Sequence, residues 1–390
     1  MKQQHCPACE SESTEAFFVV KNAPVQSVVT IRSYEDAIAI PRKDITLTFC
    51  NSCGFIFNSS FDTGIDYYSK GYEDQQGFSP TFKFFITGIT SRFINKYAVH
   101  EKSIVEIGCG KGDFLHLICE LGNNTGVGID PAFEPGREKP NGNVTFIKDF
   151  YSERYGQIAA DVIVCRHTLE HIHDPGNFVH TIRESIDGNA DVTILVEVPS
   201  MVRILKVQAF WDIFYEHCSY FSPGSLARLF KRNNFEILDS YLEYDDQYLL
   251  LEAKPTRDTI QKPGQLEEDV EELRKLVYEF VAKINHQMEE WRKRLLKMKA
   301  QNKRVAVWGG GSKAVGFLTH FDDLQVIKHV VDINPNMQGN FIPGIGMQYT
   351  NPDYLQTFNP DVLIVMNGVY QKEIRKMLSE LDLYPEMICL

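Results

Sequence analysis

The sequence lacks the long apolar run that a membrane-spanning helix needs. Its apolar stretches are much shorter than the roughly 20 consecutive apolar residues that cross a bilayer. The stretch MKQQHCPACESE at the start also lacks the apolar segment of a secretory signal peptide. We therefore expect a cytoplasmic protein with no membrane partner. Its nine cysteines should then be reduced thiols or metal ligands rather than disulfides.

Positive charge is also scarce. The chain has 40 Lys and Arg against 52 Asp and Glu, a formal net charge of −12. Such a chain is a poor general binder of nucleic acid, so we expect no nucleic-acid partner. With 43% hydrophobic and 24% charged residues, the composition is that of an ordinary globular protein. A length of 390 residues exceeds what one core usually holds, which predicts two or three domains.

Hydrophobic patterning divides the chain into five segments. Residues 1–60 hold short strands between paired cysteines, and residues 61–97 are tyrosine-rich and then helical. Residues 98–256 and 301–390 each alternate short apolar runs with helical stretches, which is typical of a parallel sheet covered by helices. Between them, residues 257–300 carry apolar residues at spacings of three and four, which predicts one long linking helix. The fold class is therefore α/β.

Two CxxC pairs stand at the ends of the first segment, Cys6 with Cys9 and Cys50 with Cys53. Each pair can form a tight turn whose two thiolates bind one ion, and four thiolates suit tetrahedral zinc with a closed shell. Buried cysteines or a redox pair are the alternatives, which two pairs in so short a domain disfavour. We expect a structural zinc site with no position left for a catalytic water.

A glycine loop follows the first apolar run of the 98–256 segment. In VEIGCGKGDF, Glu106 precedes Gly108, Gly110 and Gly112, and an amphipathic helical stretch follows. Glycines let the backbone turn sharply and approach a ligand closely. Dinucleotide-binding folds favour the spacing GxGxxG, which this loop lacks, so NAD is the less favoured of two candidate cofactors. The observed spacing is similar to that of class I, Rossmann-like methyltransferases that use S-adenosylmethionine.

Three later residues support this cofactor. Asp130 ends the next apolar run, where a carboxylate can accept the hydroxyls of a ribose. Asp149 lies where enzymes of this class often contact the adenine amine. His167 follows a further strand at the carboxyl edge of the sheet, where open α/β sheets bind ligands. We therefore expect S-adenosylmethionine to bind at this edge.

The stretch WDIFYEHCSYFS places Glu216 next to His217 among aromatic residues. It follows the strand-like DVTILVEVPS, so it should project from the same sheet edge, near the transferable methyl group. A histidine titrates near neutral pH, and an adjacent carboxylate can raise its basicity and orient its ring. The alternative is a structural histidine before a helix that begins at Ser222 and Pro223. The expected position of His217 favours a role as general base over a structural role.

These motifs together resemble one family, the zinc-containing C-methyltransferases of nucleotide-linked 4-keto-deoxysugars, which methylate C3. The resemblance covers essentially the whole chain and rests on the cysteine pairs, VEIGCGKG, YEHCSYFS, VWGGGSKA and VVDINPNMQGNFIPG. It implies that His217 is the base and Glu216 its partner. Phe214 and Tyr215 stand where the family commonly has tyrosine and histidine. The resemblance also makes the His171 and His173 stretch a turn beneath the cofactor site rather than a metal site.

Further substrate contacts are implied by the same resemblance. The segment with Tyr68 and Tyr72 matches the family region that closes over the substrate, beside Phe214. An enolate oxygen needs hydrogen-bond donors. Tyr72, Tyr215 and Tyr220 are the candidates for that role.

A second glycine loop opens the last segment, in RVAVWGGGSKAVGFL. It is not a Walker A loop, yet glycine amides, a helix N-terminus and a lysine suit an anion. The resemblance implies that this domain binds the nucleotide diphosphate of the substrate. The alternative is a Rossmann-like fold that only supports the rest of the protein. The residues expected to contact the substrate here are Gly310, Gly311, Ser312, Lys313 and Asp332.

Three functional hypotheses follow. The first is C-methylation of a nucleotide-linked deoxy-ketosugar, in which His217 removes the proton on C3 and the enolate carbon takes the methyl group. The second is O-methylation of a sugar hydroxyl, which the Phe214–Tyr215 departure keeps open. The third makes the zinc domain a partner-binding module on a degenerate methyltransferase. Glu106, the glycine loop and Asp130 are intact, which argues against degeneracy.

Overall fold

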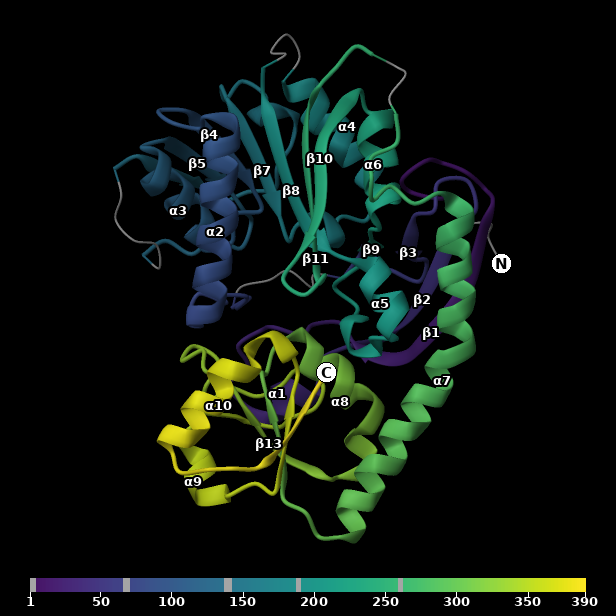
Figure 1. Cartoon of the computed structure of the whole chain (residues 1–390), viewed down its shortest axis with the longest axis vertical. Coiled ribbons are helices and arrows are strands. Elements are labelled where there is room, and N and C mark those ends of the chain that lie inside the picture. Colours follow the sequence, from purple (N-terminus) through teal and green to yellow (C-terminus); the bar gives the residue numbers. More distant parts are fainter. Residues whose placement is uncertain (1–4, 66–70, 137–141, 187–190, 259–261) are drawn as a thin grey trace.

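The computed structural model describes residues 5–65, 71–136, 142–186, 191–258 and 262–390. Three sheets organise this part of the chain, one of four strands, one of seven and one of five. In Figure 1 the seven-stranded sheet and its helices lie above the five-stranded sheet, and helix α7 runs along one side. The four-stranded sheet lies between α7 and the seven-stranded sheet.

The four-stranded sheet combines distant parts of the chain. Its order is β1-β2-β3-β9 and all its pairs are antiparallel. Strand β9 comes from the stretch that holds His217, so this stretch is hydrogen-bonded to the N-terminal sheet rather than only projecting from the central one. The elements are β1 Thr14–Pro24, α1 Tyr34–Ile38, β2 Arg42–Cys50, β3 Ile56–Asn58 and β9 Ser219–Tyr220.

The seven-stranded sheet runs β10-β11-β8-β7-β4-β5-β6. Its five parallel strands follow the alternating apolar pattern, and the antiparallel β11 inserts between β8 and β10. The strands are β4 Ser103–Ile107, β5 Thr125–Ile129, β6 Val144–Ile147, β7 Val162–Arg166, β8 Thr193–Pro199, β10 Phe235–Glu243 and β11 Tyr248–Pro255. The helices are α2 Pro80–Tyr97, α3 Asp113–Gly122, α4 Pro175–Ser185, α5 Met201–Val207 and α6 Pro223–Arg232.

Helix α7, Val270–Ala300, is a single long helix that leads to the five-stranded sheet. Asp269 caps its start, and lysines in its last turn complement the helix dipole. The parallel sheet that follows has the order β14-β13-β12-β15-β16. Its elements are β12 Val305–Trp308, α8 Ser312–Phe321, β13 Ile327–Val331, β14 Tyr349–Thr350, α9 Tyr354–Phe358, β15 Val362–Val365, α10 Gln371–Glu380 and β16 Glu386–Cys389.

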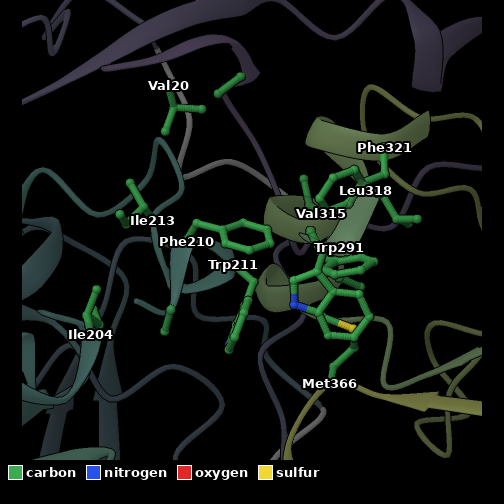
Figure 2. Packing of buried hydrophobic residues seen from close by; sticks show 14 of the residues in the cluster. Val20, Ile204, Phe210, Trp211, Ile213, Trp291, Val315, Leu318, Phe321 and Met366 are labelled. Carbon is green, nitrogen blue, oxygen red and sulfur yellow. The ribbon is translucent and has the colours of Figure 1, made fainter. Parts of the chain in front are cut away.

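One hydrophobic cluster joins the four-stranded sheet to the five-stranded sheet (Figure 2). Phe210 and Trp211, from the turn after α5, pack beside α8, and Trp291 of α7 stands edge-on to Phe317 with ring centroids 5.1 Å apart. Val20 of β1 belongs to the same cluster. This shared core fixes the second glycine loop, at the start of α8, relative to the His217 stretch. No helix within the described ranges is both long and apolar enough to cross a membrane.

Candidate active site

The first glycine loop opens a cavity of about 650 Å³ at the carboxyl edge of the seven-stranded sheet. Glu106, Gly108 and Gly110 line it where β4 ends, and Asp130 lines it where β5 ends. His167, after β7, lines it too. The parallel strands therefore bring together five of the seven expected cofactor residues, as their shared edge requires.

The loop depends on glycine for two reasons. Gly108, Gly110 and Gly112 all have positive φ, at 72°, 54° and 83°. A Cβ at Gly108 would lie 2.0 Å from Thr168 Oγ1, and one at Gly112 would lie 2.4 Å from the ring of Phe146. Gly112 itself does not line the cavity. It is the N-cap residue of α3 and packs the loop against Phe146 of β6.

Replacing Gly108 with alanine should therefore damage the cofactor cavity. We expect affinity for S-adenosylhomocysteine to fall at least tenfold and the free energy of unfolding to fall by roughly 1–3 kcal/mol, because the loop must shift and a non-glycine residue must hold positive φ. Isothermal titration calorimetry and thermal melting would measure both quantities. Gly88→Ala is the matched control, since an added Cβ there meets nothing within 4 Å. A Gly108→Ala protein that binds like wild type would contradict this reading.

The carboxylates of this cavity suit a cationic ligand. Glu106 is 2% exposed, and its Oε2 has no hydrogen-bond partner among the described residues. Burial raises its pKa to about 8, against the opposing effect of nearby Arg166. Asp130 accepts hydrogen bonds from the N–H groups of Gly110 (2.8 Å) and Ala132 (2.7 Å), so it shapes the loop as well as facing the ligand. A nucleoside with a cationic amino-acid tail, such as S-adenosylmethionine, fits these residues.

Asp149 differs from its expected role. Its carboxylate pairs with Arg154 and accepts a hydrogen bond from the hydroxyl of Tyr155, and it does not line the cavity. The next residue, Phe150, lines the cavity and has an exposed ring. Phe150 rather than Asp149 therefore lines the cavity at this loop.

A second cavity, of about 330 Å³, adjoins the first. It extends from the His217 stretch to the second glycine loop. The two cavities share wall residues from the segment 71–79 and from the loop after β7. The shared residues are Tyr72, Asp74, Gln75, Gln76, Phe78, His167 and His171. A cofactor in one cavity and an acceptor in the other would therefore meet at this wall.

His217 lies in the second cavity, beside the shared wall. Its ring centroid is 4.1 Å from that of Phe214 and 4.9 Å from that of His171, which stands nearly perpendicular to it. Burial is the main cause that lowers the pKa of His217 well below its ordinary value, and the neighbouring groups His171, His167 and Lys313 lower it further. The imidazole is therefore neutral near pH 7, as a proton acceptor must be.

The expected Glu216–His217 pair is replaced by a different arrangement. The Glu216 carboxylate accepts hydrogen bonds from the backbone N–H of Ser27 (3.0 Å) and from its hydroxyl. Ser27 Oγ lies 2.8 Å from Ser312 Oγ. Burial raises the pKa of Glu216 to about 7. Adjacent residues in this turn point to opposite sides, so Glu216 links the N-terminal sheet to the second glycine loop instead of orienting His217.

Only one of the three tyrosine candidates reaches the cavities. Tyr72 lines both. Tyr215 is fully buried, stacks on Phe61, and its hydroxyl accepts a hydrogen bond from the backbone N–H of Asp62 at 2.9 Å. Tyr220 is buried and donates to the carbonyl of Phe214 at 3.4 Å. The pairing of β9 with β3 turns these two rings into the core. Phe214 lines the second cavity as expected, and Tyr68 lies outside the described residues.

The second glycine loop borders the far end of the second cavity, where Gly311, Ser312, Lys313 and Asp332 line it. Gly310 does not line it; its N–H donates to Asp332 Oδ2 at 2.6 Å. The Lys313 ammonium contacts Asp212 at 2.7 Å and Gln247 at 3.0 Å. The expected cation is present, but an anionic ligand would have to share it with Asp212.

Three lining residues were not anticipated in these roles. His171 donates its Nδ1–H to the carbonyl of Glu216 at 2.9 Å, and its ring faces His217. Arg203 of α5 adds a second cation beside Asp212, at 3.6 Å, and its side chain is 12% exposed. Asp74 lines both cavities. The LEHIHDP stretch contained the signal for His171, whereas nothing in the local sequence of Arg203 marks it.

A buried group of ion pairs includes His167, one of the residues that line both cavities. Glu197 of β8 contacts Arg166 at 2.5 Å and His167 at 3.2 Å, and His167 also lies 3.4 Å from Glu170. These carboxylates outweigh the effect of burial and raise the pKa of His167 to about 9. His167 therefore carries a positive charge at neutral pH and is unsuited to be the base. This leaves His217 and His171 as the neutral imidazoles at the wall.

Among the residues that the structure describes, two groups of side chains could hold a metal ion. The Sγ atoms of Cys6, Cys9, Cys50 and Cys53 lie within 4.8 Å of one another, with Cys6–Cys53 at 3.7 Å and Cys9–Cys50 at 3.6 Å. Tetrahedral zinc–thiolate bonds of about 2.3 Å place sulfurs at about this separation. None of the nine cysteines forms a disulfide. The second group is Glu170, His171 and His217 at the cavity wall.

Two family models match the chain. Residues 85–240 match a methyltransferase domain, and residues 250–383 match the C-methyltransferase C-terminal domain. The first match contains the glycine loop, Asp130 and the His217 stretch, all of which border the two cavities. The chain is an S-adenosylmethionine-dependent methyltransferase. The α/β fold class expected from the sequence, with a class I methyltransferase sheet, is thereby confirmed.

Curated relatives agree with this assignment. The methyltransferase is 27% identical over 288 residues to C-methyltransferase NovU from Streptomyces niveus, covering 70% of this chain and 67% of the relative. It is 29% identical over 102 residues to the ubiquinone biosynthesis O-methyltransferase of Pseudoalteromonas translucida (strain TAC 125). This match covers 24% of this chain and 42% of that relative. Among solved structures, the dimethyltransferase RosA from Streptomyces davawensis has a TM-score of 0.36 and 17% identity, over 45% of this chain and 54% of that one.

Proposed function

We propose that this methyltransferase transfers a methyl group to a carbon of a nucleotide-linked deoxy-ketosugar. The observation that carries the proposal is the placement of His217 in the cavity of the second glycine loop, beside the wall that this cavity shares with the cavity of the first glycine loop. The match of residues 250–383 to the C-terminal domain of C-methyltransferases supports carbon as the acceptor, as does the resemblance to NovU, itself described as a C-methyltransferase.

The residues of this chain would divide the work as follows. His217 would take a proton from the carbon next to the ketone, which turns that carbon into a nucleophile; Tyr72, which lines both cavities, would donate a hydrogen bond to the enolate oxygen. S-adenosylmethionine, when bound, supplies an electrophilic methyl group. The carbon–methyl bond forms as the sulfur–methyl bond breaks, and His217 later releases its proton to water. Orientation across the shared wall adds to the rate because both reactants are held in place.

The diphosphate of the substrate would bind at the end of the second cavity where the cationic side chains of that cavity lie. Lys313 and Arg203 flank Asp212 there, and the start of α8 lines the same cavity. Much of the remaining lining is acidic, including Glu73, Asp332 and Glu373. Carboxylates accept hydrogen bonds from hydroxyls, so this part suits the sugars of a nucleotide sugar better than its phosphates.

Hydrogen exchange in deuterated water is the test. The protein is incubated with dTDP-, GDP- or CDP-linked 4-keto-deoxysugars and S-adenosylhomocysteine, and the C3 proton is followed by NMR. We expect loss of that proton above the enzyme-free rate for one of these sugars, because only enolisation exchanges it. Absence of exchange with every sugar, together with methyl transfer to a hydroxyl, would favour O-methylation, the alternative left open by Phe214 and Tyr215.

We also propose that Cys6, Cys9, Cys50 and Cys53 bind one structural zinc ion. The sulfur separations fit such a site, and Cys6, Cys50 and Cys53 are buried in the core that includes Phe55, Phe221 and Leu226. The ion would connect the N-terminal sheet to the packing beneath α6. No catalytic step is assigned to it.

A further inference from the structure

Asp74 lines the cofactor cavity, and no lysine or arginine of the described residues forms an ion pair with its carboxylate. It lies in the segment 71–79, outside the residues that match the methyltransferase domain, and it lines both cavities. Its Oδ2 lies 3.5 Å from the position that a Cβ on Gly110 would take, so the carboxylate sits against the glycine loop. Its side chain is accessible, but protein surrounds it closely enough that desolvation raises its pKa to about 6.

Lys111 compensates the charge of Asp74 only in part. Within the described part of the chain, its only hydrogen-bond donor is its own backbone N–H, and no lysine or arginine lies within ion-pair distance. Lys111, its nearest source of favourable charge, points its ammonium to the carbonyl of Ala132 at 3.5 Å. Glu106 also lines the cofactor cavity, and its buried Oε2 has no hydrogen-bond partner among the residues that the structure describes. Two such carboxylates around one loop indicate a cationic ligand group.

The segment that carries Asp74 is held firmly on both sides. Glu73 accepts a hydrogen bond from Asn334 Nδ2 at 3.0 Å, and Gln75 Nε2 donates to Asp113 Oδ2 at 2.9 Å. Ser79 Oγ donates to Glu373 Oε2 at 2.7 Å. These contacts position the Asp74 carboxylate before any ligand binds, so a cation placed there gains attraction without an ordering cost.

We propose that Asp74 binds the α-ammonium group of the methionine part of S-adenosylmethionine, opposite Glu106. The ammonium, unlike the sulfonium, has N–H groups to donate to both carboxylates. Asp74 would thereby be a binding residue that closes the methionine end of the cavity from outside the methyltransferase domain. This inference depends on the cofactor and not on the sugar substrate.

Two thioether ligands isolate this interaction, S-adenosylhomocysteine and its desamino analogue, which differ only in the ammonium. By calorimetry, Asp74→Asn should weaken binding of S-adenosylhomocysteine by roughly 10- to 100-fold, as expected for loss of a charge-assisted hydrogen bond. Binding of the desamino analogue should stay unchanged. Glu35→Gln, which removes the same charge from an exposed residue of α1, should alter neither affinity.

Equal weakening of both ligands, or no weakening of S-adenosylhomocysteine, would overturn the assignment. Melting of the ligand-free variants shows whether they fold, and Asp74→Glu, which keeps the charge, should retain most of the preference for the ammonium. The wild-type protein gives a check that needs no variant. It must bind S-adenosylhomocysteine at least tenfold more tightly than the desamino analogue, and equal affinities would refute the proposal.

Discussion

Replacing His217 with alanine is expected to lower turnover by roughly 10²- to 10⁴-fold, the usual contribution of a positioned base. Affinity for S-adenosylhomocysteine should remain, because His217 lines the second cavity and not the cofactor cavity. The measurements are single-turnover methyl transfer to the sugar found by exchange, and calorimetry. His173→Ala is the matched control, since this histidine is exposed and lies outside both cavities.

The pH dependence of the methyl-transfer rate should also identify His217 as the base. The pKa of His217 is lowered well below 6.5, so the ring is neutral and able to accept a proton at pH 7 and above. The rate should therefore stay level as pH falls towards 6.5 and decline only at lower pH, where the ring becomes protonated. A decline centred near pH 7 or above would indicate a different base. Full activity of the His217→Ala protein would remove the assignment altogether.

Cys50→Ser is expected to remove the zinc ion and to destabilise the N-terminal sheet severely. Structural zinc binds small domains with apparent free energies of about 10–16 kcal/mol at pH 7, and that binding energy contributes to folding. Loss of one thiolate would also leave buried cysteines Cys6 and Cys53 without their ion. Metal analysis should fall from one zinc per wild-type chain to well below one, and thermal melting should show an early transition.

Cys389→Ser is the control for this experiment, because Cys389 lies in β16 and belongs to neither metal-capable group. It should retain one zinc and the wild-type melting temperature. Retention of zinc by Cys50→Ser would refute the site. Two metal ions per wild-type chain would point to Glu170, His171 and His217 as a second site, and loss of one ion in His217→Ala would identify it.

The His217 stretch shows the limit of reading neighbours in sequence as neighbours in space. Glu216 is adjacent to His217, yet its carboxylate contacts Ser27, which is 189 positions away. The ring of His171, which sequence reasoning set aside, stands nearly perpendicular to that of His217 at 4.9 Å between centroids. Side-chain direction depends on the local turn and on the pairing of β9 with β3, neither of which a motif specifies.

The cofactor residues were more predictable because they follow consecutive strand ends. Glu106 and Asp130 follow from strand order alone, since parallel strands present their carboxyl ends at one edge. Asp149 was harder, because it stands in a loop where Arg154 and Tyr155 bind its carboxylate. Arg203 and Asp74 gave no signal, since neither belongs to a motif and only packing brings them to the cavities.

The sequence by itself determined the α/β class, the glycine loop and the grouping of four cysteines, because each depends on local spacing: apolar period, glycine position and CxxC turns. Tertiary structure alone decided which groups share a cavity. The cluster of Phe210, Trp211, Trp291 and Phe317 brings the second glycine loop to the His217 stretch. That packing also places Asp74 between the two cavities, since the segment 71–79 is held by residues more than 250 positions away.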